Sequence, residues 1–173
     1  ITERVTIDGT TQTGYTDSPL IELDGTTVTA SGSLPGHGLQ IAGNDSVVRG
    51  LAINRFSALG PASGIHIQGD NNTVESSYIG TDVTGTIARP NGIGIELAGA
   101  SGENTIGGSA AARNVISGNN DRGVSLLGGV SDTLIAGNYI GLDATGMDPL
   151  GNGVYGIQIS TTRQDKTGVF DAY

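Results

Sequence analysis

The 173-residue sequence contains no cysteine and no tryptophan, and aromatic residues make up only 4% of it. Without cysteine, the chain has no disulfide, no thiolate nucleophile and no cysteine-ligated zinc. Eight Lys and Arg stand against seventeen Asp and Glu, which gives a net charge of −9. No window supplies the basic stripe that nucleic-acid binding needs, so no nucleic-acid partner is expected. No long apolar run is present either, and we expect no membrane insertion.

Glycine is abundant, with 30 residues. It does not recur at every third position, so the composition is not that of collagen. Together with regularly spaced aliphatic residues, it predicts a folded chain that turns often and packs aliphatic side chains. The acidic surface is consistent with neutral or cationic partners, or with divalent cations.

A short unit recurs five times: glycine, an aliphatic residue, any residue, an aliphatic residue. Successive copies begin 26, 30, 29 and 33 residues apart. Aliphatic residues at alternate positions place the apolar side chains of a strand on one face. Each strand is too short to bury that face alone, so we expect like strands to stack on one another. The copies begin at Gly38, Gly64, Gly94, Gly123 and Gly156.

Two further strand-like units follow each of the first four copies. Three strands per repeat predict an all-β fold, a right-handed parallel β-helix (β-solenoid) of about five to six coils. Parallel strands need a crossover connection, and the rest of each coil supplies it. We expect residues 1–24 to form an N-terminal cap with lead-in strands, residues 25–160 the coils, and residues 161–173 an atypical tail that caps the last coil or belongs to another element. The second units are Val47-Val48, Thr73-Val74, Thr105-Ile106 and Leu134-Ile135, and the third units end at Ile53, Ile79, Ile116 and Ile140.

A longer similarity relates every second coil. Residues 77–85 closely match residues 138–146, which lie 61 residues later. Coils with a long turn after the third strand therefore alternate with coils that have shorter turns. Asn114 and Asn138 both stand two residues before a third-strand isoleucine. Because Asn tolerates corner conformations and bonds to nearby backbone, we predict an asparagine ladder at these two positions.

The segments "NTIGGSAAARNVISGNNDRGVSL" (104–126) and "NYIGLDATG" (138–146) resemble the parallel β-helix repeats of large secreted or cell-surface bacterial proteins. The resemblance covers roughly residues 5–160, and the tail departs from it. It implies the β-helix fold and an extracellular or cell-surface location. It implies little about activity, because this family is defined mostly by its architecture.

The outward residues of the glycine-led strands are expected to form one exposed line, which is the candidate ligand-binding surface. Polysaccharide lyases and related enzymes of this fold use such a surface, although a solvated polar ladder is the simpler interpretation. Adjacent coils lie about 4.8 Å apart, so His66 and Glu96 are candidates for a catalytic base and its orienting carboxylate. An accidental cross-strand contact is the alternative for that pair. The line consists of Gln40, His66, Glu96, Ser125 and Gln158.

Asp82 and Asp143 fall at equivalent places in the two long turns, and each is followed two residues later by Thr-Gly. Repeated acidic turns are candidate calcium sites, since calcium binds carboxylate oxygens. The alternative is a turn fixed by the Asp side chain, and the dense Asp spacing of known calcium-binding repeats is missing. Apart from calcium, no cofactor is expected.

Two functions from different classes remain. The first is a structural or adhesive module whose turns contact glycans or other copies of the chain. The second is a fragment of a carbohydrate-active enzyme, a polysaccharide lyase or glycoside hydrolase, whose groove follows the first-strand face. The open strand edges at the ends of a β-helix also predict end-to-end self-association, unless Val169 and Phe170 close the last coil. A strict monomer in light scattering at high concentration would contradict that association.

Overall fold

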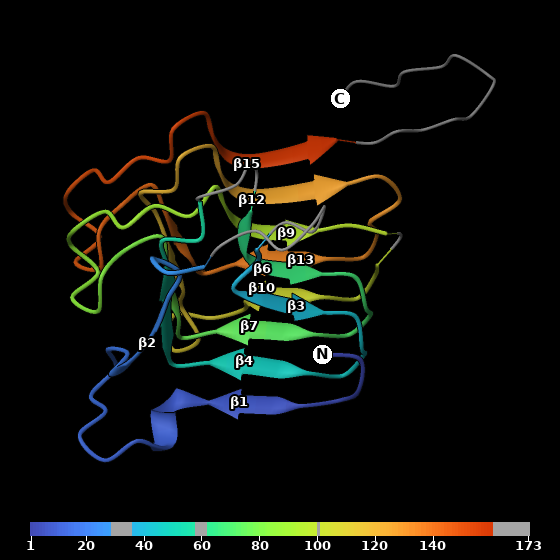
Figure 1. Cartoon of the computed structure of the whole chain (residues 1–173), viewed down its shortest axis with the longest axis horizontal. Helices are drawn as coiled ribbons and strands as arrows, with labels where there is room; N and C mark the ends of the chain where they lie inside the picture. The colour runs from blue at the N-terminus through green and yellow to red at the C-terminus, as the bar shows by residue number, and fades with distance from the viewer. Residues whose placement is uncertain (29–35, 58–61, 100, 161–173) are drawn as a thin grey trace.

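The computed structural model shows a parallel β-solenoid with three strands in each coil (Figure 1). The structure describes residues 1–28, 36–57, 62–99 and 101–160. Four complete coils, together with partial coils at the two ends, make about four to five turns, somewhat fewer than the five to six expected. The described helical structure is a single 3₁₀ turn, η1 (Gly9–Thr11). The all-β fold with three strands per coil is therefore confirmed.

Each coil contributes one strand to each of three parallel five-stranded sheets, A, B and C. Sheet A contains β1 (Thr6–Asp8), β4 (Val47–Arg49), β7 (Thr73–Glu75), β10 (Thr105–Gly107) and β13 (Leu134–Ala136). Sheet B contains β2 (Ile21–Asp24), β5 (Leu51–Asn54), β8 (Tyr78–Ile79), β11 (Val115–Ile116) and β14 (Tyr139–Ile140). Sheet C contains β3 (Leu39–Ile41), β6 (Ser63–Ile67), β9 (Ile93–Leu97), β12 (Arg122–Leu127) and β15 (Tyr155–Ser160).

The glycine-led repeats stack in register in sheet C, so that each aliphatic residue lies over its counterpart in the next coil. Ile65, Ile95 and Val124 are fully buried in this way. Ile157 and Ile159 were expected inside as well, but they are 44% and 69% exposed. Both belong to β15, the last strand of sheet C, and no described coil lies above it. Within the described part of the chain, the interior of the solenoid is therefore uncovered at this end.

Asparagines stack at all three corners of the coil, and at the corner between sheets C and A the backbone amide of Asn72 donates to Oδ1 of Asn104. At the corner between sheets A and B, Nδ2 of Asn114 donates to Oδ1 of Asn138 at 3.0 Å, which confirms the predicted ladder. The other two ladders were not foreseen. The longer one, between sheets B and C, runs through Asn91, Asn119 and Asn152. Because these amides also bond to buried backbone groups, they hold the coils at a fixed spacing.

The segment expected as an N-terminal cap supplies the end strands β1 and β2 of sheets A and B. At the edge of β3, the N-terminal ammonium of Ile1 donates to the carbonyl of Gln40, and the amide of Ala42 donates to the carbonyl of Ile1, each at 2.8 Å. These bonds occupy part of the free edge of sheet C. The predicted tail, 161–173, lies outside the described residues, and so do Val169 and Phe170. End-to-end association therefore stays a prediction.

Candidate functional site

The five residues of the predicted line do lie in one row on the outer side of sheet C. The strand register pairs each member with the next, from Gln40 on β3 to Gln158 on β15. The expectation that this row is exposed is wrong at its centre. His66 is only 8% exposed and Ser125 is fully buried, whereas Gln40 is exposed. The row is therefore not an open surface along which a polymer could lie.

A compact polar cluster surrounds the predicted His66–Glu96 pair. Nδ1 of His66 lies 3.1 Å from Oε1 of Glu96, although the two atoms do not form a hydrogen bond. The ring of His37 stacks on that of His66, with centroids 4.5 Å apart. Ser63 links both, because its backbone N–H donates to Nδ1 of His37 and its hydroxyl lies 3.4 Å from Oε2 of Glu96. No periodic signal pointed to His37, since it precedes its strand.

The protonation states of this cluster follow from burial and neighbouring charge. Burial alone raises the pKa of Glu96, but the contact with His66 and the charges of both histidines outweigh it, and the pKa of Glu96 lies below its usual value. Burial, followed by the charge of His66, lowers the pKa of His37. Glu96 is thus held ionised near pH 7. The burial of this cluster leaves a polymeric substrate little access to it.

The lowered pKa of Glu96 predicts a pH-dependent contribution to stability. A carboxyl whose pKa is lower in the folded state stabilises the fold above its unfolded pKa, and this contribution is lost as pH falls through the folded pKa. We therefore expect the Tm of the wild type to fall more steeply than that of Glu96→Gln between about pH 6 and pH 3. Thermal unfolding followed by circular dichroism measures both profiles. Parallel profiles would contradict the lowered pKa.

The two long turns that carry Asp82 and Asp143 stack on each other, with a hydrogen bond from the amide of Ala144 to the carbonyl of Gly85. Oδ1 of Asp143 accepts from the amide and the hydroxyl of Thr145, and the same bonds lower the pKa of that carboxyl. Oδ1 of Asp82 likewise accepts from the hydroxyl of Thr84. These contacts support the interpretation of the two carboxylates as turn-forming groups. Among the described residues, no three His, Asp or Glu side chains gather as a metal site.

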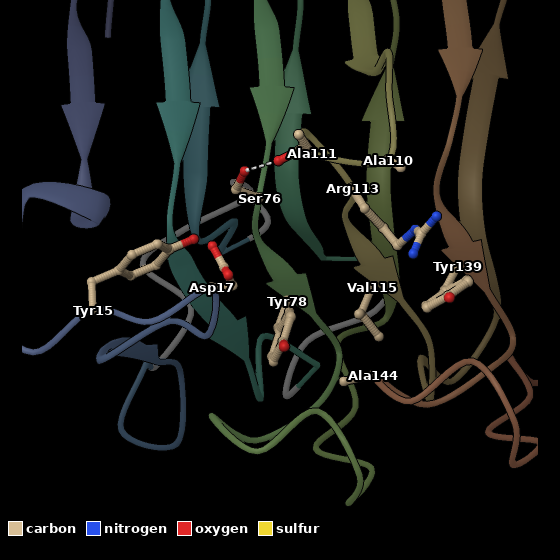
Figure 2. Close-up of a pocket in the computed structure, with 10 residues that line it drawn as sticks. All are labelled: Tyr15, Asp17, Ser76, Tyr78, Ala110, Ala111, Arg113, Val115, Tyr139 and Ala144. Carbon is tan, nitrogen blue, oxygen red and sulfur yellow. Dashed lines mark hydrogen bonds between the residues drawn. The ribbon is translucent and has the colours of Figure 1, made fainter.

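A groove of about 350 Å³ lies on the outer side of sheet B (Figure 2). Tyr78, Val115 and Tyr139 are aligned by the strand register and form its floor. Parallel coils bring the remaining walls together from turns that are far apart in the sequence. The lining residues are Tyr15, Asp17, Ser76, Tyr78, Ala110, Ala111, Arg113, Val115, Tyr139 and Ala144.

The two-coil repeat explains why tyrosines gather here. Tyr78 and Tyr139 each precede an inward-facing isoleucine, so both rings point outward from sheet B. The repeat places them two coils apart, about 9.6 Å, with Val115 between them. Tyr78 is only 7% exposed, because it packs in a small apolar cluster with Val115 and the turn residue Ala144. The matching Tyr-Ile pairs of the two-coil repeat were the available sequence signal for this site.

The two ends of the groove differ in charge (Figure 2). At one end the guanidinium of Arg113 lies 4.0 Å from the ring centroid of Tyr139, and its Nε donates to the carbonyl of Gly137 at 2.9 Å. At the other end stand Tyr15 and the exposed Asp17. Burial, followed by the charge of Asp17, raises the pKa of Tyr15, so its phenol stays protonated at neutral pH. From one end to the other, the groove therefore presents a cation, an apolar floor and an acid–phenol pair.

Comparison of the chain with protein-family models, with curated proteins and with solved structures found no match. The chain is a parallel β-solenoid. Within the described residues, no helix has the length and hydropathy of a membrane span.

Proposed function

We propose that the chain is a rigid adhesive module of an extracellular or cell-surface protein, and that it binds glycan in the groove on sheet B. The observation that carries the proposal is the lining of that groove, where partly buried tyrosines and apolar side chains alternate with polar groups. Pockets of roughly 300–1,000 Å³ with an apolar lining and a few placed polar groups are typical of small-ligand sites. A sugar has an apolar face and a polar rim, and both find partners here.

The rigidity of the groove floor supports this function. The strands that carry Tyr78, Val115 and Tyr139 belong to one hydrogen-bonded sheet. At the corner before them, Asn114 bonds across coils to Asn138. A site that is already formed before binding loses little conformational entropy when the ligand arrives. The solenoid therefore presents the groove as a fixed surface, which suits adhesion.

The alternative function, a polysaccharide lyase or glycoside hydrolase, requires a different surface. Its candidate residues, His66 and Glu96, lie on sheet C, where His66 is 8% exposed. A general base has to reach the proton that it removes, directly or through one water. Burial therefore disfavours catalysis by this pair, and the binding experiment below also tests for it.

Binding of the purified chain to a panel of polysaccharides tests the proposal. Ala111 is an exposed wall residue, so Ala111→Trp fills the groove without disturbing the core, and we expect binding to weaken at least about tenfold. Ala42→Trp, at an exposed position that does not line this groove, is the matched control and should bind like the wild type. The readouts are biolayer interferometry, with and without calcium, and an assay for released sugar ends.

Two results would overturn this function. Equal binding by Ala111→Trp and the wild type would show that the groove is not the site. Release of reducing or unsaturated ends that His66→Ala or Glu96→Ala abolishes would make the chain an enzyme.

A further inference from the structure

The geometry points to a more specific ligand: a glycan in which one acidic sugar adjoins a neutral sugar, with the carboxylate bound by Arg113. This inference rests on the proposed function, because it concerns the same groove. It goes beyond that function by assigning the charge pattern of the ligand and the residue that binds its charged group.

Arg113 is held in place without a carboxylate partner. Elsewhere in the described residues, Arg49, Arg55 and Arg122 each pair with an acidic side chain. No described carboxylate lies within ion-pair distance of Arg113, whose contacts are instead the ring of Tyr139 and the carbonyl of Gly137. The carbonyl occupies Nε, so the terminal nitrogens of the guanidinium are left for a ligand. A guanidinium fixed in this way is a preformed receptor for a planar carboxylate, which it binds through two parallel hydrogen bonds.

The opposite end of the groove excludes a second acidic group. Asp17 is exposed and carries a negative charge there (Figure 2). Its oxygens accept hydrogen bonds from hydroxyl groups but repel another carboxylate. The phenol of Tyr15, which is kept protonated, adds a donor at the same end. This end therefore suits the hydroxyls of a neutral sugar.

The floor between the two ends is apolar. Val115 is 2% exposed, and it packs with Tyr78 and the partly buried Ala144. An apolar floor accommodates the C–H face of a sugar ring but offers no partner for a charge. The ligand therefore has its charge at one end and an uncharged body.

The charge of the whole chain favours the same pattern. With a net charge of −9, the protein repels a polymer that carries an anion on every sugar, and this long-range repulsion slows association. A glycan with isolated acidic sugars has a lower charge density, so it meets less repulsion. The local attraction of Arg113 then determines where the carboxylate of the glycan binds.

Three matched ligands test the inference by isothermal titration calorimetry. They are a short oligosaccharide of alternating acidic and neutral sugars, the same compound with its carboxyl groups reduced to alcohols, and an oligosaccharide of acidic sugars only. We expect the wild type to bind the alternating compound at least about tenfold more tightly than either of the others. Added salt should reduce this preference for the alternating compound over its reduced form.

Variants of Arg113 separate recognition from general binding. Arg113→Gln should bind the alternating compound and its reduced form equally, and Arg113→Lys should recover only part of the preference, because an ammonium lacks the fork geometry. Arg122→Gln makes the same charge change outside the groove and should keep the wild-type preference. Circular dichroism confirms that each variant is folded.

The possible failures are distinguishable. If the wild type binds all three compounds equally and Ala111→Trp abolishes that binding, the assignment of Arg113 is wrong while the glycan-binding function stands. If Arg113→Gln keeps the wild-type preference for the alternating compound over its reduced form, another residue binds the carboxylate and the inference is likewise overturned. If the wild type binds none of these compounds and no member of the polysaccharide panel, the proposed function fails together with the inference.

Discussion

Replacement of Asn119 by alanine is expected to lower the free energy of unfolding by about 3 kcal/mol. Asn119 is 2% exposed and stands in the middle of the ladder between sheets B and C. Its Nδ2 donates to the carbonyl of Ile79 at 3.1 Å and to Oδ1 of Asn152 at 2.9 Å, and its Oδ1 accepts from Asn91 at 3.1 Å. Alanine leaves the carbonyl of Ile79 and the amide of Asn91 with fewer partners in a dry interior. Each buried group deprived of its partner costs about 1–3 kcal/mol.

Asn152→Ala is the matched control, because Asn152 ends the same ladder in a partly buried position. The groups that this change deprives of a partner lie closer to water, so we expect a loss of only about 1 kcal/mol. Equilibrium unfolding in urea, followed by circular dichroism, measures both changes. Equal losses would mean that the position of an amide within the ladder does not matter, and the account of the corners would be wrong.

Gly94→Ala is expected to destabilise the fold by about 2–3 kcal/mol. A Cβ at this position would overlap the carbonyl oxygen of Gly123 in the next coil and would lie 2.9 Å from Nδ2 of Asn119. Neither neighbour can move freely, since the carbonyl belongs to the stacked strand and the amide to the ladder. The first position of the repeat is therefore glycine because the coils approach each other closely there. Backbone freedom is not the reason at this residue.

Gly151→Ala provides the comparison for this prediction. A Cβ at Gly151 meets no atom within 4 Å, so we expect a change of less than about 0.5 kcal/mol. The same urea titrations give both values. If Gly94→Ala were as mild as Gly151→Ala, the sheet would have to yield at the contact between coils, and the rigid stacking on which the groove depends would be refuted.

The fold was predictable from the sequence because its signals are local and repeated. Alternating aliphatic residues such as Ile65 and Ile67 identify the inner face of a strand, and the repeat spacing identifies which strands stack. The same reasoning placed His66 beside Glu96. It did not reveal that this part of the row is buried, because periodicity tells which residues share a face but not what covers that face. The stacking of His37 on His66 was missed for the same reason.

The corners and the groove were harder to predict. The glycine of the following strand stands three residues after Asn91 but four residues after Asn119 and Asn152. An alignment on the glycines therefore moves Asn91 out of line with the other two. The groove combines side chains from separate turns, from Tyr15 to Ala144, which only the stacked coils bring together. Arg113 in particular gave no signal in the sequence, and its proposed role rests on its lack of a carboxylate partner among the described residues.

The alternation of long-turned and short-turned coils has a consequence for multivalent binding. Each two-coil unit adds one outward tyrosine to sheet B, as Tyr78 and Tyr139 illustrate. An array built from further units of this kind would extend the groove along the solenoid axis without new packing. Contacts with successive parts of one polymer would then act together, and avidity would rise with the number of coils even if each contact stayed weak. Adhesive strength would thus depend on array length, which duplication of a two-coil unit changes in a single step.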